Sequence, residues 1–180
     1  MLKITIPLVL LAIGCSHTQN IPQTDNAITT ISSDIKNFQT VEPDLYRGGR
    51  LTAANIRFLS QVHHVKTIIS FETYWNAPEV KQIEIETAKE LGINLIHVPM
   101  NPVGDINADF VWKAVDLVAK EQRPLYFHCY RGSERTGLVA AGYRMKYENW
   151  TYKQATDEMD KYGFSPHYKE WKNILPNPNK

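Results

Sequence analysis

The stretch that decides the fold is residues 128–136, which read His128-Cys129-Tyr130-Arg131-Gly132-Ser133-Glu134-Arg135-Thr136. The cysteine stands six positions before Arg135, with a glycine between them and a threonine directly after the arginine. A tight loop of this length can present successive backbone N–H groups to the oxygens of one phosphate. Gly132 supplies the backbone freedom that such a bend needs. The stretch therefore predicts a phosphate-binding loop with a nucleophile at its base.

The flanking residues predict a strand before this loop and a helix after it. Residues 124–128 form a short apolar and aromatic run, which is typical of a buried strand. Leu138, Val139, Ala141, Gly142 and Met145 give the segment after the loop a small apolar face with helical spacing. A helix that begins near Arg135 would direct the positive end of its dipole at a bound anion. Strand, loop and helix in this order are the context that a phosphate-binding loop requires.

The residue types in the loop predict nucleophilic chemistry at phosphorus. Arg135 can hold two phosphate oxygens at once with its planar guanidinium. Donors that converge on Cys129 favour its thiolate over the thiol. A thiolate that attacks phosphorus forms a phosphocysteine and divides hydrolysis into two easier steps. We expect the residues from Cys129 to Arg135 to line the substrate pocket, namely Tyr130, Arg131, Gly132, Ser133 and Glu134 between them.

A simpler interpretation treats Cys129 as an inert buried core residue and Arg135 as a surface residue, because free cysteines are often buried. The complete set of His128, Gly132, Arg135 and Thr136 with its flanking elements favours the functional interpretation.

The pattern His-Cys-x5-Arg-Thr resembles the cysteine-dependent protein tyrosine and dual-specificity phosphatases. The resemblance implies that Cys129 is the nucleophile, Arg135 the phosphate clamp and Thr136 a helper in thiolate turnover. It also implies a reaction without a metal or another cofactor. Residues 45–50 (Leu-Tyr-Arg-Gly-Gly-Arg) and 158–174 are similar to the beginning and end of small bacterial members, so the resemblance covers about residues 41–175. Glu134 departs from the neutral or basic residue of many members and leaves the substrate preference open.

The general acid is expected on a loop upstream of the cysteine strand, because the leaving oxygen needs a proton. Residues 99–107 are rich in proline and glycine and follow an expected strand over 94–98. In the phosphatases that the chain resembles, the acid comes from the corresponding loop, so Asp105 is the first candidate. Asp109 is the reserve, and Glu72 could also reach the site. The alternative role for Asp105 is to cap the next helix.

The first 15 residues predict a cleaved targeting segment. Lys3 precedes an apolar run over 4–13, which is far shorter than the roughly 18 residues that cross a bilayer. Residues 11–15 (Leu-Ala-Ile-Gly-Cys) resemble the bacterial lipobox, which implies lipidation of Cys15 after cleavage. Ser16 in the next position favours the outer membrane, with the chain facing the periplasm. An ordinary signal peptide that is cut nearby is the alternative.

The composition bounds the rest of the chain. Residues 16–40 are polar and predict a flexible tether, and residues 41–175 suit one domain with a single core. The 20 basic and 19 acidic residues nearly balance, so we expect no nucleic-acid partner and only a phosphorylated protein or small phosphoester as substrate. No Cys and His cluster has metal-site spacing, and the chain is expected to act as a monomer.

Alternating patterns predict an α/β fold with a mainly parallel central sheet flanked by helices. Strands are expected at 41–46, 66–71, 94–98 and 124–128, and helices at 52–61, 78–91, 107–121, 135–147, from 151 and at 168–175. The loop then lies at the carboxyl end of a strand, where ligands of such sheets bind.

Three functions remain open on the sequence alone. The first is hydrolysis of phosphotyrosine, phosphoserine or phosphothreonine in proteins, or of an inositol or lipid phosphate. The second is sulfur transfer of the rhodanese type, which Arg135 and the following Thr136 and Gly137 disfavour. The third is an inactive phosphate-binding envelope protein, which the retained Cys129 and Arg135 disfavour.

Overall fold

The computed structural model describes residues 34–104 and 106–176, in which five strands form one sheet of order β1-β2-β5-β3-β4. The strands are β1 (Gln39–Glu42), β2 (Leu45–Gly48), β3 (Thr67–Ser70), β4 (Asn94–His97) and β5 (Leu125–His128). β1 pairs antiparallel with β2, whereas the pairs β2–β5, β5–β3 and β3–β4 are parallel. The mainly parallel sheet that the sequence predicts is therefore confirmed.

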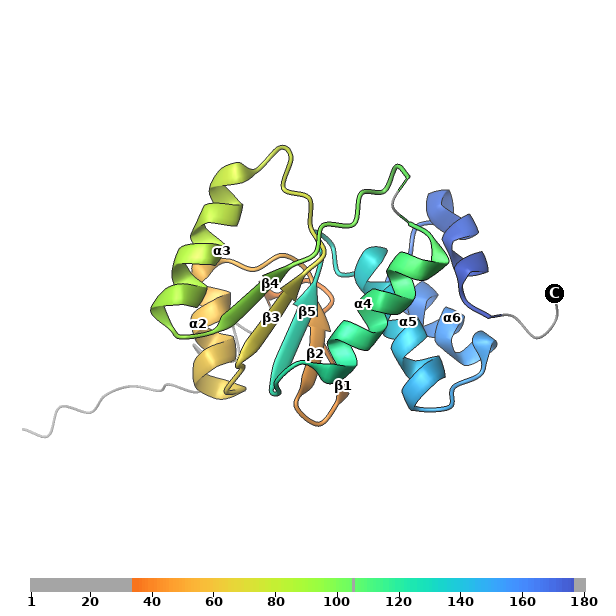
Figure 1. The fold of residues 1–180 in the computed structure, drawn as a ribbon, viewed down its shortest axis with the longest axis horizontal. Coiled ribbons are helices and arrows are strands. Elements are labelled where there is room, and N and C mark those ends of the chain that lie inside the picture. Colours follow the sequence, from red (N-terminus) through yellow and green to blue (C-terminus); the bar gives the residue numbers. More distant parts are fainter. Residues whose placement is uncertain (1–33, 105, 177–180) are drawn as a thin grey trace, which may run out of the picture.

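Helices cover both faces of this sheet, as Figure 1 shows. α2 (Ala53–Val62) and α3 (Pro78–Glu90) lie on one face. α4 (Ala108–Lys120) and α5 (Arg135–Tyr147) lie on the other, with α6 (Tyr152–Lys161) packed on α5. A 3₁₀ segment, η1 (Pro166–Ile174), ends the described chain. Every expected helix is present within a few residues of its predicted bounds.

The core follows from the alternation of side chains along the buried strands. Ile68 and Tyr126 point to the face under α2 and α3, whereas Ile69 and Phe127 point to the face under α4 and α5. All four are fully buried. Because successive strand residues face opposite sides, a sheet that is covered on both faces needs large apolar residues at consecutive positions. Each such side chain contributes about 2 kcal/mol through burial.

The helices α2 and α6 each begin with a capping box, in which two polar side chains bind backbone N–H groups reciprocally. The Thr52 side chain accepts a hydrogen bond from the Asn55 N–H, and the Asn55 side chain accepts from the Thr52 N–H. Thr151 and Gln154 make the same reciprocal pair at the start of α6, as the sequence predicts. Each cap stabilises its helix by about 1 kcal/mol.

The amino-terminal part of the domain differs from the expectation in two ways. The segment 41–46 is not one extended strand, because Asp44 has a φ of 63° and turns the chain between β1 and β2. Within the expected tether, Ile35 is 3% exposed and packs in the core under α2. The rest of the expected tether and the segment 1–15 with Cys15 lie outside the described residues.

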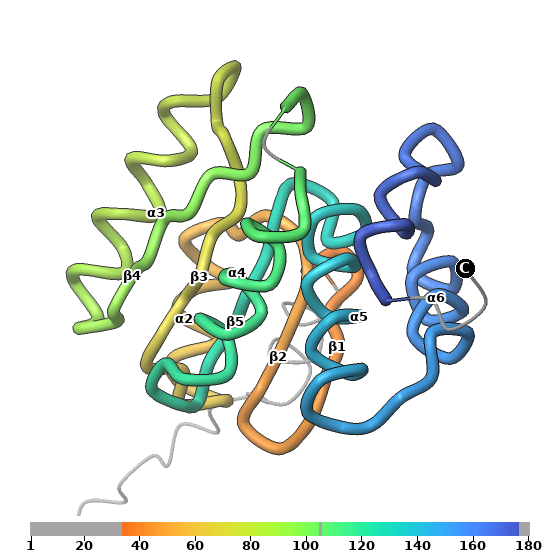
Figure 2. The backbone as a smooth tube through the Cα atoms, turned by 45° about the vertical axis from the view of Figure 1, so that its right-hand side comes forward, coloured from red at the N-terminus to blue at the C-terminus, as the bar shows by residue number. Residues whose placement is uncertain are grey.

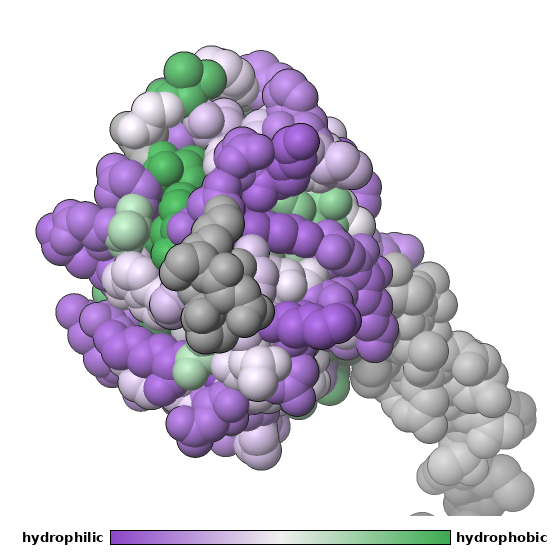
Figure 3. Space-filling view, turned by 90° about the vertical axis from the view of Figure 1, so that its right-hand side faces the viewer, coloured by the Kyte–Doolittle hydropathy of each residue, from purple (hydrophilic) through white to green (hydrophobic). Residues whose placement is uncertain are grey.

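One face of the molecule is largely polar among the described residues (Figure 3). On the face shown in Figure 3, hydrophobic residues form narrow strips among hydrophilic ones and no broad patch. Within residues 34–104 and 106–176, none of the helices has both the length and the apolar character that crossing a membrane requires.

The loops that follow the parallel strands converge at one end of the molecule. In Figure 2 the loops after β3, β4 and β5 and the η1 segment all lie at the upper end. The carboxyl ends of parallel strands are where ligands of such sheets bind. The 128–136 stretch therefore lies where the sequence places it, at the end of β5 and the start of α5.

Candidate active site

Residues 129–134 form a compact loop between β5 and α5, and Gly132 determines its path. Gly132 has a φ of 75°, which residues with a side chain rarely adopt. A Cβ atom at this position would lie 2.5 Å from the carbonyl carbon of Gly48, at the end of β2. The loop can therefore fold back against β2 only with glycine here.

Cys129 lies at the base of this loop and is 1% exposed. It nevertheless lines a pocket of about 260 Å³. We call it the cysteine pocket. The loops after β4 and β5, the start of α5 and the η1 segment form its walls. The other lining residues are Pro102, Tyr130, Arg131, Glu134, Arg135, Tyr168 and Trp171. Cys129 therefore borders a cavity at the mouth of the loop, which is where a nucleophile for a phosphate group is needed.

Arg135 is the first residue of α5, and its guanidinium lines the same pocket. Its Nη1 donates a hydrogen bond of 3.0 Å to the carbonyl of Phe71, directly after β3. This contact holds the side chain between the end of β3 and the loop and leaves further donors of the guanidinium for an anion. The positive end of α5 points at the same place.

The loop carries its own ion pair beside the cysteine. Arg131 binds the Glu134 carboxylate with two nitrogen atoms, and the Ser133 hydroxyl donates to the same carboxylate at 3.0 Å. Glu134 is 6% exposed. The acid that departs from the usual pattern thus neutralises Arg131. Thr136, the expected helper, is fully buried, and its hydroxyl donates to the Gly48 carbonyl at 3.4 Å.

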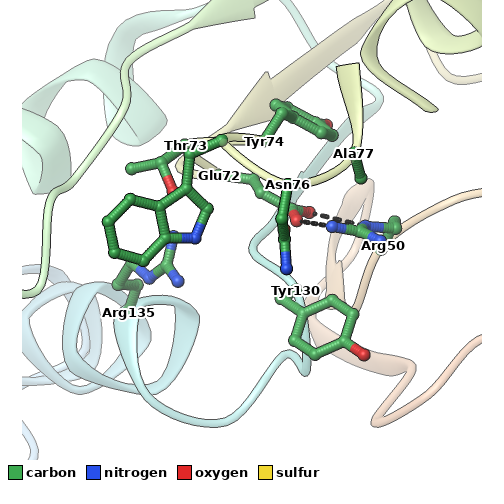
Figure 4. Close-up of a pocket in the computed structure, with 9 residues that line it drawn as sticks. Arg50, Glu72, Thr73, Tyr74, Asn76, Ala77, Tyr130 and Arg135 are labelled. Carbon is green, nitrogen blue, oxygen red and sulfur yellow. Dashed lines mark hydrogen bonds and ion pairs between the residues drawn. The ribbon is translucent and has the colours of Figure 1, made fainter. Parts of the chain in front are cut away.

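A second pocket of about 190 Å³ adjoins the first and shares Tyr130 and Arg135 with it. We call it the side pocket, and its other lining residues are Arg50, Glu72, Thr73, Tyr74, Trp75, Asn76 and Ala77. Figure 4 shows Arg50 paired with Glu72, and the Nε–Oε2 distance is 3.1 Å. The Arg50 guanidinium also lies 4.5 Å from the centre of the Tyr130 ring.

The three candidate acids have different positions. Asp105 lies outside the described residues. Asp109 is exposed in the first turn of α4 and pairs with Lys113 at 2.8 Å, and it is not among the residues that line the cysteine pocket. Glu72 lines the side pocket, and Arg50 binds both of its carboxylate oxygens. Pro102 lines the cysteine pocket, which brings the expected acid loop to its wall.

The N-cap of α4 is Asn107, whereas capping of this helix was the alternative role expected for Asp105. The Asn107 side chain accepts a hydrogen bond of 3.0 Å from the Phe110 N–H and caps α4. An N-cap satisfies N–H groups that a helix otherwise leaves unpaired. The start of this helix therefore does not need Asp105 as its cap.

His128 has a partner that the sequence interpretation missed. Its Nε2 lies 2.7 Å from the Glu84 carboxylate, and both side chains are almost wholly buried. Burial alone lowers the pKa of His128, but the adjacent Glu84 outweighs it and holds that pKa above its ordinary value. Burial likewise raises the pKa of Glu84, and His128 reverses this, so the net direction is down. The two groups form a buried ion pair.

A weak signal for Glu84 exists in the sequence. Glu84 is four residues before Ala88 and seven before Leu91, so it lies on the apolar face of α3. An acid on that face predicts a buried partner. Tyr168 and Trp171 also line the cysteine pocket, and neither was predicted as a site residue.

Arg47 is a further buried charge near the loop. It is 1% exposed, and its Nη2 donates to the Gly132 carbonyl at 2.7 Å. Burial lowers the pKa of Arg47, while the charges of Glu158 and Cys129 oppose this effect. An arginine stays protonated in proteins. Its cation therefore lies behind the loop, near the cysteine.

No group of three or more His, Cys, Asp or Glu side chains is arranged to hold a metal ion within residues 34–104 and 106–176.

Comparison with known proteins places this geometry in a family. The model of a family described as the tyrosine phosphatase family matches residues 34–174. The chain belongs to the tyrosine phosphatase family. The family match begins at residue 34, before β1.

Two curated relatives match most of this chain. The dual specificity protein phosphatase TpbA of Pseudomonas aeruginosa is 28% identical over 129 residues, which are 71% of this chain and 55% of TpbA. The inositol diphosphatase SIW14 of Saccharomyces cerevisiae is 28% identical over 134 residues, which are 72% of this chain and 46% of SIW14. The chain thus spans about half the length of these relatives.

Solved structures of the same two proteins share the fold of this tyrosine phosphatase domain. The core catalytic domain of SIW14 from S. cerevisiae, a PP-IP phosphatase, has a TM-score of 0.66 at 25% identity. The match covers 79% of this chain and 86% of that one. TpbA from P. aeruginosa has a TM-score of 0.60 at 23% identity, with 77% and 83% covered.

Proposed function

We propose that this chain hydrolyses phosphomonoesters through a phosphocysteine on Cys129. The observation that supports the proposal most strongly is that Cys129 and Arg135 line one pocket, at the end of β5 and the start of α5. A thiolate, a guanidinium and a helix amino terminus at one cavity are the parts that phosphoryl transfer to sulfur needs. Membership of the tyrosine phosphatase family supports the same reaction.

In the first step the Cys129 thiolate attacks phosphorus and forms an S–P bond. The P–O bond to the leaving group breaks, and its electron pair goes to the leaving oxygen. Asp105 donates a proton to that oxygen, so an alcohol or phenol departs. Arg135 and the loop N–H groups bind the equatorial phosphate oxygens and stabilise the charge that is spread over them.

In the second step a water molecule attacks the phosphocysteine. Asp105, now ionised, takes a proton from this water, and the S–P bond breaks to return the thiolate and release inorganic phosphate. Thr136 assists the departure of the sulfur in this proposal. The roles of Asp105 and Thr136 rest on the resemblance of the surrounding residues to the cysteine-dependent phosphatases.

The charges and rings at the two pockets favour an aromatic phosphate on a protein as substrate. Arg131 is bound to Glu134 and Arg50 to Glu72, so Arg135 is the one lining arginine that pairs with no carboxylate within residues 34–104 and 106–176. A single uncompensated cation suits one phosphate group better than several. Aromatic rings supply much of the wall: Trp75, Tyr130, Tyr168 and Trp171. Such rings stack well on a phenyl ring.

A direct test is turnover by the purified protein with three substrates: a phosphotyrosine peptide, a phosphoserine peptide and an inositol polyphosphate. We expect the highest kcat/KM for the phosphotyrosine peptide, vanadate inhibition and no loss of activity with a chelator. The second candidate function is hydrolysis of an inositol phosphate, which similarity to an inositol diphosphatase favours. A higher kcat/KM for the inositol polyphosphate would support it. Activity that a chelator removes would contradict the cysteine route.

We also propose that the chain is a lipid-anchored protein of the bacterial cell envelope, attached through Cys15. The support is the lipobox-like sequence at residues 11–15 and Ser16 after it. The test is metabolic labelling with a fatty-acid analogue in a bacterial host, followed by membrane fractionation. Label on the wild-type chain and none on Cys15→Ser is the expected result, and equal labelling of both would contradict the anchor.

A further inference from the structure

Three successive carbonyl groups of the loop accept hydrogen bonds from outside it. The Tyr130 carbonyl accepts from the backbone N–H of Arg50 at 3.1 Å. The Arg131 carbonyl accepts from Asn37 Nδ2 at 3.0 Å, and the Gly132 carbonyl accepts from Arg47 Nη2 at 2.7 Å. All three donors belong to residues 37–50, which contain β1 and β2.

These bonds determine which way the N–H groups of the loop point. In a trans peptide the C=O and N–H bonds of one plane point in opposite directions. A carbonyl that is held toward residues 37–50 therefore turns the following N–H toward the inside of the loop. The N–H groups that are fixed in this way belong to Arg131, Gly132 and Ser133. Inward N–H groups are the donors that an oxyanion needs.

Arg47 is suited to this task because it is buried and has few other partners. Its Nε and Nη1 have no hydrogen-bond partner in the described part of the chain, and the nearest carboxylate, of Glu158, is 3.8 Å from Nη1. Burying a guanidinium with unmade hydrogen bonds is costly for stability. Such a group is easier to explain by a role at the loop than by a role in stability.

Asn37 reaches the loop from an unusual backbone conformation. Its φ is 54°, and its side-chain amide donates both to the Arg131 carbonyl and to the Tyr162 carbonyl at the end of α6. Asparagine is one of the few residues with a side chain that adopt such φ values readily. The residue thus joins the amino-terminal segment, the loop and α6 at one point.

The backbone behind the loop is itself held in place. The Tyr126 hydroxyl donates to the Gly49 carbonyl at 2.7 Å, and a Cβ at Gly49 would lie 3.2 Å from the Tyr130 carbonyl. The contact between β2 and the loop is therefore close and leaves little room for an alternative path. The donors of Arg47 and Arg50 are therefore held at a fixed distance from the loop.

We infer that Asn37, Arg47 and the Arg50 N–H form a carbonyl clamp that sets the oxyanion-binding geometry of the loop before any substrate arrives. Asn37 and Arg47 are positioning residues, because they act through the loop backbone. Arg47 also places a buried cation near Cys129, and cysteines beside cations are generally more reactive. The inference deepens the proposed function, and it rests on that function only in taking the ligand of the loop to be an oxyanion.

The experiment measures tungstate binding by calorimetry in the full chain with Cys129→Ser, so that it needs no turnover. Asn37→Gly removes the side-chain donor and tolerates the same backbone. Asn149→Gly is the matched control, since Asn149 has a φ of 59° and lies after the opposite end of α5. We expect Asn37→Gly to weaken tungstate binding about five-fold, as for the loss of one hydrogen bond, and Asn149→Gly to leave it unchanged. Equal Kd values for both variants would overturn the clamp.

A second pair of variants tests Arg47 in the background with Cys129 intact. The readout is the rate at which iodoacetamide alkylates Cys129 at pH 6, which follows the thiolate population. We expect Arg47→Met to slow this alkylation about ten-fold, and Arg47→Lys, which keeps the charge, to restore most of the rate. Circular dichroism verifies that both variants fold. Equal alkylation rates in Arg47→Met and the wild type would remove Arg47 from this role.

Failure of the clamp can be told apart from failure of the proposed function. If the wild type hydrolyses no phosphomonoester while Asn37→Gly still weakens tungstate binding, the clamp stands and the proposed function falls. If the wild type turns over and Asn37→Gly binds tungstate normally, the clamp falls alone. If Arg47→Met does not fold, the Asn37→Gly result decides the inference.

Discussion

Glu84 Oε1 lies 2.7 Å from His128 Nε2, and neither side chain has meaningful contact with solvent. The pair connects the middle of α3 with the residue directly before the cysteine. His128 Nδ1 lies 3.4 Å from the Cys129 carbonyl, so the ring is held on both sides. The Tyr74 hydroxyl donates to the same carboxylate. Breaking one partner of such a pair leaves the other poorly satisfied.

Glu84→Gln tests this pair. We expect the free energy of unfolding at pH 6 to fall by about 2 kcal/mol, because the buried histidine loses its charged partner. Urea denaturation followed by fluorescence measures the change. The control is Glu86→Gln on the exposed side of the same helix, where the carboxylate meets only Gln82. A change of less than about 0.5 kcal/mol in Glu84→Gln would contradict the ion pair.

The same pair predicts how stability depends on pH. The pKa of His128 is raised above 6.5, so its contribution is complete below about pH 6.5 and is lost as the pH rises through the raised value. The pKa of Glu84 is lowered below 4.5, so its contribution is present above about pH 4.5 and is lost as the pH falls through the lowered value. Urea titrations from pH 5 to 9 should show a decline toward the alkaline side in the wild type. This part of the decline should be absent in Glu84→Gln.

Gly132→Ala tests the close contact of the loop with β2. A Cβ here would lie 2.5 Å from backbone of Gly48, and the φ of 75° adds strain. We expect at least about a hundred-fold loss of kcat/KM, because a misplaced binding site costs about that much. Gly92→Ala is the control, since Gly92 has a φ of 67° with nothing within 4 Å. Equal losses of activity in the two variants would show that the positive φ alone causes the loss, and not the contact with Gly48.

Asp105→Asn tests the general acid. We expect a larger loss of kcat for alkyl phosphates than for nitrophenyl phosphate, because a good leaving group needs little protonation. For a poor leaving group the loss should be about 10²–10⁴-fold. Asp109→Asn is the matched control four residues on, where the carboxylate is exposed and bound to Lys113. Equal slowing of good and poor leaving groups would remove Asp105 from the role.

Glu134→Gln tests whether the acid in the loop restricts substrate charge. The substitution should release Arg131 from its ion pair and let it bind a second anionic group. We expect kcat/KM for a peptide with acidic residues beside its phosphotyrosine to rise about three-fold or more, relative to a neutral peptide, at low salt. An unchanged ratio between the two peptides would show that Glu134 does not set this preference.

Local patterns predicted the parts of this fold that depend on local physics. The strand, the loop and the helix around Cys129 follow from an apolar run, a glycine and a helical face that are adjacent in sequence. The starts of α6 after Thr151 and of α3 at Pro78 were predicted for the same reason. These features need no knowledge of distant contacts.

Features that depend on distant contacts were missed. The turn at Asp44 is a local feature that was also missed, although Pro43 and Asp44 are residues that favour turns and aspartate tolerates a left-handed backbone. Ile35 is one of a few scattered apolar residues in a polar segment, and its burial depends on contacts with the core under α2. Arg47 and Glu84 are charged residues in the core, and their partners are 85 and 44 residues away in sequence. Charged residues are usually exposed, so composition gives no indication of such pairs.

The central claim is that the sulfur of Cys129 carries the phosphoryl group during turnover. The most direct measurement is to mix the protein with a phosphotyrosine peptide, quench with acid within milliseconds and analyse the peptides by mass spectrometry. The account predicts one phosphoryl group on the peptide that contains Cys129, a larger amount of it in Asp105→Asn if hydrolysis slows more than its formation, and none in Cys129→Ser. Sustained turnover with no phosphorylated Cys129, or wild-type turnover by Cys129→Ser, would contradict it.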